Sequence, residues 1–163
     1  MSKSPVFEAQ ILLPDGHLSA QADRLLGFEA RYSRIKKQLQ LMLQADELER
    51  WSTKYHSKKL AILSLLADQY PLAIFYGDVG TGKTANAEAI ANRLARDALI
   101  EDATLFKLSN KVRGTGKVGE MGSLIADAFA EISKSIGSGK GRAFLIIDEG
   151  DSLGASRSQE HSH

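Results

Sequence analysis

A glycine-rich octapeptide at residues 77–84 carries the residue types that bind a polyphosphate. It reads Gly-Asp-Val-Gly-Thr-Gly-Lys-Thr and matches the pattern G-x-x-x-x-G-K-S/T without a mismatch. Because glycines lack a Cβ atom, the backbone of such a loop can curl close to phosphate oxygens. Successive amide groups then point at the phosphates, and a helix that follows adds partial positive charge. We therefore predict a phosphate-binding loop.

The side chains of this loop have separate predicted roles. Lys83 would place its charge on the β- and γ-phosphates of a nucleoside triphosphate, and the Thr84 hydroxyl would ligate Mg²⁺. The backbone of the loop and of the residue after it would surround the phosphates. The predicted nucleotide-binding residues are Gly77, Asp78, Val79, Gly80, Thr81, Gly82, Lys83, Thr84 and Ala85.

Two neighbouring acids supply the second chemical feature. Asp148 and Glu149 follow the apolar run Ala143–Ile147, which is typical of a strand buried on both faces of a parallel sheet. Ligands bind at the carboxyl ends of strands in such sheets. We predict that Asp148 holds Mg²⁺ through water and that Glu149 polarises the water that attacks the γ-phosphate. The predicted catalytic residues are thus Glu149 and Lys83, and the predicted metal ligands are Thr84 and Asp148.

The elements that must position these residues alternate between strands and helices. Apolar runs predict strands at 72–76, 103–109 and 143–147, and helical periodicity predicts helices at 85–97 and 121–135. This alternation is typical of an α/β fold with a parallel sheet, flanked by helices and joined by right-handed crossovers. The inner side of the last helix is predicted to carry Leu124, Ile125, Ala128, Phe129 and Ile132.

The part of the chain before the first predicted strand is less regular. We interpret residues 1–22 as an arm or linker, extended around 6–13, because prolines and a glycine interrupt it. One amphipathic helix is predicted from Phe28 to near Arg50, and a second from Thr53 to Gln69. The apolar stripe of the first helix consists of Phe28, Tyr32, Ile35, Leu39 and Met42.

Composition limits the classes of protein. A chain of 163 residues with 43% hydrophobic residues favours one domain. The net charge of +1 gives no support for a nucleic-acid surface, and the absence of cysteine excludes disulfides and thiolate metal sites. No apolar run reaches the ~18 residues of a membrane span, and the N-terminal residues lack the apolar region of a secretory signal. A cytoplasmic protein without membrane contact is the expectation.

The segment at 145–157 resembles the Walker B region of AAA+ ATPases, which has D-E-x-D followed at this distance by an arginine, here Arg157. Residues 117–120 resemble the pore loop of that family. The Leu-Gly-Phe at 26–28 sits where such proteins contact adenine. By this resemblance residues 77–84 are the Walker A motif and 143–149 the Walker B motif.

The resemblance implies a P-loop NTPase of the AAA+ type whose partial nucleotide-binding domain covers 23–163. It implies ATP and Mg²⁺ as cofactors and the activity of an ATP-driven protein remodeller. Such enzymes are usually homo-hexamers that pull a protein substrate or adaptor through a central pore. The compact layout is similar to the pachytene-checkpoint type, which remodels HORMA-domain proteins.

Two departures from the family change the expectation. Lys117 stands where the pore loop usually has an aromatic residue, and lysine grips a passing chain less well than a ring does. Residues 158–163 leave no room for the sensor strand, the fifth strand, the arginine finger or the lid. Since the family strand order is 5-1-4-3-2, the strands at 72–76 and 143–147 would face a gap or pair directly. We expect a fragment or truncated product, incomplete at the C-terminus, that binds Mg-nucleotide weakly and turns it over poorly.

Three other functions share part of these features. A nucleic-acid-linked ATPase, such as a helicase loader, shares the motifs but is disfavoured by the neutral charge. A GTPase needs N-K-x-D after the acidic strand, whereas Asn110–Arg113 ends in arginine and precedes it. A nucleotide-gated interaction module without catalysis stays open.

Overall fold

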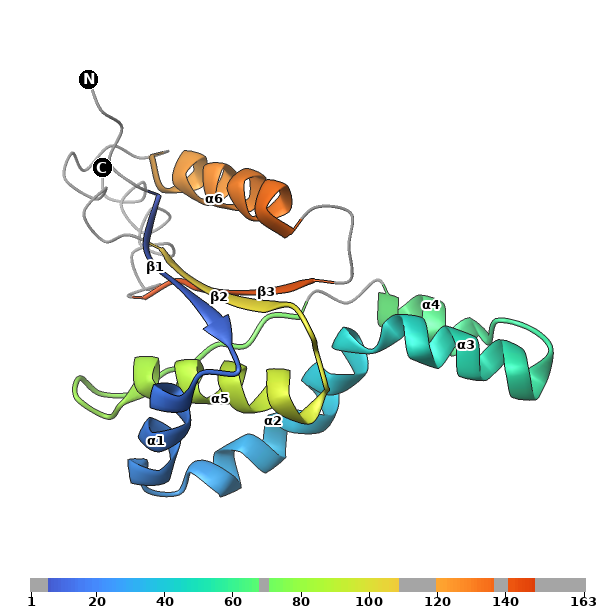
Figure 1. The fold of residues 1–163 in the computed structure, drawn as a ribbon, viewed down its shortest axis with the longest axis horizontal. Coiled ribbons are helices and arrows are strands. Elements are labelled where there is room, and N and C mark those ends of the chain that lie inside the picture. Colours follow the sequence, from blue (N-terminus) through green and yellow to red (C-terminus); the bar gives the residue numbers. More distant parts are fainter. Residues whose placement is uncertain (1–5, 68–70, 109–119, 137–140, 149–163) are drawn as a thin grey trace, which may run out of the picture. The chain divides into compact units, whose positions relative to one another are not determined.

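The computed structural model describes residues 6–67, 71–108, 120–136 and 141–148. The chain divides into two compact units (Figure 1). The sheet unit comprises residues 1–13 and 101–163, and the helical unit comprises residues 14–100. The α/β class predicted from the sequence is confirmed by the alternation of β2, α6 and β3 along the chain.

The sheet unit contains three described strands in the order β1-β2-β3 and one described helix. These elements are β1 (Phe7–Leu13), β2 (Ala103–Leu108), α6 (Glu120–Ile136) and β3 (Arg142–Ile146). The β2 and β3 strands are parallel and joined through α6, as predicted. The β1 strand is antiparallel to β2, so the prediction of a wholly parallel sheet is wrong. β1 comes from the N-terminal segment and not from a strand–helix–strand crossover, so nothing requires it to run parallel.

One face of this sheet packs against α6, which lies along it in Figure 1. The rings of Phe7 and Phe106 meet with their centroids 4.9 Å apart. The remaining core residues of this layer are Leu108, Leu124, Ala128 and Ile132. Phe129 was predicted on the inner side of α6 but is 57% exposed. The buried stripe of α6 is centred on Ala128. Successive helical residues are about 100° apart around the helix axis, so Phe129 lies at the edge of this stripe.

The helical unit contains five described helices, among which α5 packs against α1 and α2. They are α1 (Gly16–Arg24), α2 (Phe28–Leu43), α3 (Ala45–His56), α4 (Ala61–Ala67) and α5 (Lys83–Asp97). The helix predicted at 85–97 is thus confirmed and begins two residues earlier. Its buried face is rich in alanine, which lets α1 and α2 approach closely (Figure 1).

Regular structure occupies much of the segment interpreted as an arm. The extended stretch predicted at 6–13 is confirmed as β1, and most of α1 falls before residue 23. Asp15 caps α1 by accepting from the Leu18 amide at 2.9 Å. Its backbone N–H donates to Asn92 Oδ1 on α5 at 2.7 Å, and Asn92 Nδ2 donates to Ser19 Oγ at 3.0 Å. These polar contacts fasten the start of α1 to α5.

The two helices predicted at 28–50 and 53–69 are three helices in the structure. The first ends at Leu43, and the φ of −104° and ψ of 23° of its C-cap residue Gln44 leave the helical range. The second ends at His56, and its C-cap residue Ser57 adopts a left-handed φ of 54°. Ser52 is fully buried and fixes the turn that follows, since its hydroxyl donates to Lys58 O at 2.8 Å and accepts from the Leu60 amide at 3.0 Å. The predicted helix boundaries were therefore wrong.

The strand predicted at 72–76 is also wrong. The described stretch 71–77 has no regular secondary structure, and Leu72, Ile74 and Tyr76 are 76%, 77% and 92% exposed. A strand exists only as part of a hydrogen-bonded ladder. The family order places another strand beside this one, and that strand is not among the three described. The described sheet has the order β1-β2-β3 and does not include residues 72–76.

Candidate nucleotide-binding site

The loop before α5 has a backbone that depends on its glycines. Gly77, Gly80 and Gly82 have φ angles of 142°, 81° and 75°. Residues with a Cβ atom rarely adopt such angles, whereas glycine does so without steric cost. Around Gly80, no atom of the described residues lies within 4 Å of the place that a Cβ would take. The loop therefore leaves open space beside its backbone, as a phosphate cradle requires.

Helix α5 begins directly after this loop. Gly82 is its N-cap residue, and among the described residues no side chain caps the helix start. The first regular helical bond runs from the Asn86 amide to Gly82 O at 2.9 Å. An uncapped helix start presents backbone amides and the positive end of the helix dipole. Both attract an anion, so the start of α5 and the loop fit a phosphate group.

Lys83 folds back over its own loop. Its ammonium donates to Gly77 O at 3.0 Å and to Asp78 O at 2.9 Å. The hydroxyl of Thr81 donates to the same Asp78 oxygen at 2.8 Å. The lysine charge is thus held at the loop by neutral carbonyl groups. Phosphate oxygens are stronger acceptors for an ammonium than carbonyl oxygens are. Lys83 can therefore exchange its carbonyl partners for the oxygens of a bound phosphate.

The predicted metal ligands lie in different units. Thr84 is the second residue of α5 and half-buried, in the helical unit. Asp148 is a half-buried turn residue shortly after β3, in the sheet unit. Glu149 and Lys117 lie outside the described residues. Hydroxyl and carboxylate oxygens are the donors that Mg²⁺ prefers, so Thr84 and Asp148 fit it chemically.

No group of three or more His, Cys, Asp or Glu side chains could hold a metal ion within the described ranges. A magnesium ion bound with a nucleotide takes most of its ligands from phosphates and water. Searched over the same residues, the chain shows no helix with the length and apolar character needed to cross a bilayer.

Sequence reasoning missed the residues behind the loop. Asn86, three residues after Lys83, is only 3% exposed, and its Nδ2 donates to Gly82 O at 2.8 Å. The Arg31 guanidinium on α2 donates to Asn86 Oδ1 at 3.3 Å and to Leu26 O at 2.6 Å. The sequence places the amide side chain of Asn86 among the alanines of the inner face of α5, which indicates a buried polar contact. Nothing in the sequence indicates that the partner of this amide lies on α2.

The turn at 25–27 consequently lies beside the phosphate loop. Leu25 Cδ2 is 3.7 Å from the position that a Cβ on Gly82 would occupy. Gly27 has a left-handed φ of 70° and starts α2. Leu26 is 90% exposed. This places the segment that resembles an adenine contact next to the predicted phosphate site.

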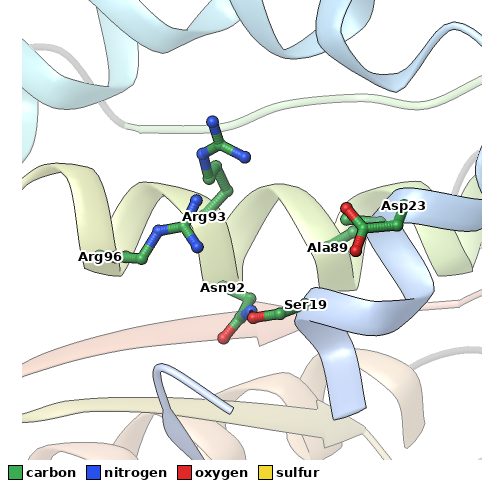
Figure 2. Close-up of a pocket in the computed structure, with 7 residues that line it drawn as sticks. Ser19, Asp23, Ala89, Asn92, Arg93 and Arg96 are labelled. Carbon is green, nitrogen blue, oxygen red and sulfur yellow. The ribbon is translucent and has the colours of Figure 1, made fainter. Parts of the chain in front are cut away.

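A pocket between α1 and α5 is a separate feature (Figure 2). Ser19 and Asp23 line it from α1, and Asn92, Arg93 and Arg96 line it from α5. Its volume is about 80 Å³. Ligand sites usually measure roughly 300–1,000 Å³, so this pocket is too small for a nucleotide.

Comparison with known proteins decides the family. A model of the ATPase family associated with various cellular activities (AAA) matches residues 73–163. The chain belongs to the AAA family of ATPases. The matched region includes the glycine loop, α5, β2, α6, β3 and both acids of the predicted Walker B motif.

Curated relatives resemble the chain over its whole length. CD-NTase-associated protein 6 from Escherichia coli strain KTE188 is 57% identical over 163 residues, covering 100% of this chain and 54% of the relative. The protein of the same name from Escherichia coli strain MS 115-1 is 35% identical over 169 residues, covering 99% of this chain and 54% of the relative. The chain spans about half the length of these curated relatives.

Two solved structures share the fold. The structure of the E. coli MS115-1 HORMA:CdnC:Trip13 complex matches with a TM-score of 0.76 and 34% identity, covering 99% of this chain and 55% of that chain. The structure of Rhizobiales Trip13 matches with a TM-score of 0.65 and 30% identity, covering 91% of this chain and 53% of that one. The resemblance to the pachytene-checkpoint type is thus confirmed as a relationship to Trip13-like proteins.

Proposed function

We propose that this AAA chain binds ATP with Mg²⁺ at residues 77–85. The observation that carries the proposal is the loop itself. Three of its glycines have positive φ angles, open space lies beside Gly80, and an uncapped helix start follows. Backbone amides, helix dipole and a lysine charge thus meet in one short segment, which is the arrangement that holds a β/γ-phosphate.

Each polar side chain then has a role in hydrolysis. Lys83 exchanges the carbonyls of Gly77 and Asp78 for β- and γ-phosphate oxygens and stabilises the charge that develops there. Thr84 and Asp148 hold Mg²⁺, which when bound neutralises phosphate charge and orients the triphosphate. Glu149 orients and polarises the attacking water.

The partner class follows from the relatives. One of the solved structures that this chain matches is a complex of HORMA, CdnC and Trip13. We propose that the protein to which the chain belongs remodels a HORMA-domain protein in the cytoplasm, as a homo-hexamer. The match to that complex, with 34% identity over 99% of this chain, supports this partner over nucleic acid.

A Glu149→Gln variant tests the catalytic part. It keeps the shape of the side chain and removes the base, so ATP affinity should stay within about twofold while phosphate release falls by a factor on the order of 100 or more. Equilibrium binding of labelled ATP and a phosphate-release assay measure the two quantities. Loss of ATP binding in Glu149→Gln with retained turnover of the residual complex would contradict the assigned role.

The partner and assembly are tested with the same variant. The protein carrying Glu149→Gln is mixed with a purified HORMA-domain protein with and without ATP. Light scattering behind size-exclusion chromatography should show a hexamer and an ATP-dependent complex. A complex equally strong without nucleotide, or none in either condition, would contradict the remodelling proposal.

A further inference from the structure

Helix α5 buries two asparagines, and one of them lies directly behind the phosphate loop. Asn86 and Asn92 are each 3% exposed. A buried amide without partners costs on the order of 1–3 kcal/mol, so buried amides are normally hydrogen-bonded on both sides. Asn92 binds the start of α1, as described above. The partners of Asn86 belong to the loop and to α2.

The contacts of Asn86 admit a single orientation of its amide. Nδ2 faces the carbonyl oxygen of Gly82 at 2.8 Å, and Oδ1 faces the Arg31 guanidinium at 3.3 Å. A flipped amide would set oxygen against oxygen on one side and N–H against N–H on the other. The same Arg31 nitrogen also donates to Leu26 O at 2.6 Å. A continuous hydrogen-bonded path therefore runs from Leu26 through Arg31 and Asn86 to Gly82.

The two ends of this path, Leu26 and Gly82, lie where a single bound nucleotide would contact both of them. Gly82 is the last loop residue before Lys83, at the predicted phosphate site. Leu26 is a 90% exposed apolar residue on the turn whose Leu25 packs beside Gly82. A nucleotide held by its phosphates at the loop extends its base away from them, and a flat base packs well on an apolar side chain. The turn at 25–27 provides such a surface within the same unit.

We propose that Asn86 and Arg31 are positioning residues that set the turn at 25–27 against the phosphate loop. With the turn held there, the base of a bound nucleotide contributes to the binding affinity in addition to its phosphates. Neither residue touches the nucleotide. The inference rests on the proposed function of the loop and adds how the site distinguishes a nucleotide from a plain polyphosphate.

The test compares two probes, Mg-ADP and Mg-pyrophosphate, which differ in the nucleoside. Their Kd values are measured by displacement of a fluorescent ADP analogue from the wild type, Asn86→Ala and Arg31→Ala. We expect each variant to lose about tenfold in affinity for ADP, the worth of one buried hydrogen bond, and less than threefold for pyrophosphate. The preference of the site for ADP over pyrophosphate should therefore shrink.

Two controls separate positioning from other effects. Asn92→Ala removes the same residue type with the same burial from the same helix, so it should lower the unfolding temperature while leaving the preference for ADP unchanged. Arg31→Lys keeps the charge, but its side chain is one bond shorter and ends before the position of the Arg31 nitrogen that donates to both acceptors, so it should behave like Arg31→Ala. Arg31 is exposed, and its variants test the path even if Asn86→Ala fails to fold.

The outcomes are distinguishable from one another. Equal losses for ADP and pyrophosphate, rescue by Arg31→Lys, or an equal change in Asn92→Ala would each overturn the positioning role. An unchanged preference in both Asn86→Ala and Arg31→Ala would overturn it as well. A wild type that binds neither probe would instead contradict the proposed function of the loop and remove the basis of this inference.

Discussion

The hydroxyl of Tyr32 on α2 donates a hydrogen bond of 2.9 Å to Asp97 Oδ2 at the end of α5. Lys36 Nζ reaches the same oxygen at 2.8 Å. Burial raises the pKa of the Tyr32 hydroxyl, and the bond to Asp97 raises it further. For Asp97, burial works to raise the pKa, but the hydrogen bonds from Lys36 and Tyr32 outweigh it and hold the pKa below its usual range. This cluster joins α2, and with it the turn at 25–27, to the helix of the phosphate loop.

Tyr32→Phe should destabilise the chain by roughly 1.5 kcal/mol, because it removes a hydrogen bond to a charged group and keeps the buried ring. Urea unfolding followed by circular dichroism measures the change. Tyr55→Phe is the matched control, since Tyr55 is 63% exposed and its hydroxyl should matter little. Equal midpoints for wild type and Tyr32→Phe would contradict a stabilising role for this bond.

Asp97 should make the stability of the chain depend on acidic pH. A carboxyl whose pKa is lower in the folded state stabilises the fold above the unfolded pKa of about 3.9, and this stability is lost as the pH falls through the folded pKa. Asp97→Asn should thus be less stable than the wild type at pH 6. The difference in unfolding free energy should shrink below about pH 4. A difference that stays constant from pH 6 to pH 2 would show that this carboxylate does not carry the dependence.

Gly80→Ala isolates the backbone requirement of the loop. A Cβ at Gly80 meets no described atom within 4 Å, but its φ is 81°. The substitution therefore adds strain on the order of 1–2 kcal/mol without a clash and should weaken Mg-ADP binding about tenfold. Gly16→Ala is the control, because a Cβ there also meets no described atom and its φ is not in the left-handed range. Unchanged binding in Gly80→Ala would show that the loop does not need this angle to hold phosphate.

Thr84→Ala should reduce the part of nucleotide affinity that depends on magnesium. The Kd for ADP is measured in Mg²⁺ and in EDTA, and the ratio should approach one in the variant. Thr84→Ser keeps the hydroxyl and should preserve the ratio. If Thr84→Ala lost affinity equally with and without the metal, the hydroxyl would not be a magnesium ligand.

Local signals in the sequence predicted most of the elements that build the site. The glycine loop is contiguous in the chain, α5 and α6 have clear helical periodicity, and β2 and β3 are apolar runs. Each of them could therefore be predicted without knowledge of distant contacts. The break at Gln44 could not, because no glycine or proline marks it. The exposed run at 72–76 has the composition of a buried strand, but composition cannot supply the neighbour that a strand needs.

Contacts between distant residues were the part that the sequence could not show. Arg31 and Asn86 are 55 positions apart, and Asp15 and Asn92 are 77 apart. Neither pair forms a pattern that spacing reveals. The antiparallel pairing of β1 with β2 likewise joins segments that are far apart in the chain, with Leu13 opposite Ala103. The contact of Arg31 with Asn86 places the turn at 25–27 against α5, and the contact of Asp15 with Asn92 places the start of α1 there. The surroundings of the loop could therefore be described only from the structure.

Binding of Mg-ADP to the 163-residue chain, measured by isothermal titration calorimetry for the wild type and Lys83→Ala, tests the central claim most directly. The account predicts one saturable site in the wild type and an affinity at least about tenfold weaker in Lys83→Ala, since a charge-assisted contact to phosphate is lost. Lys37→Ala, which removes an exposed charge from α2, should bind as the wild type does. A wild type without saturable binding, or a folded Lys83→Ala with an unchanged Kd, would contradict the account.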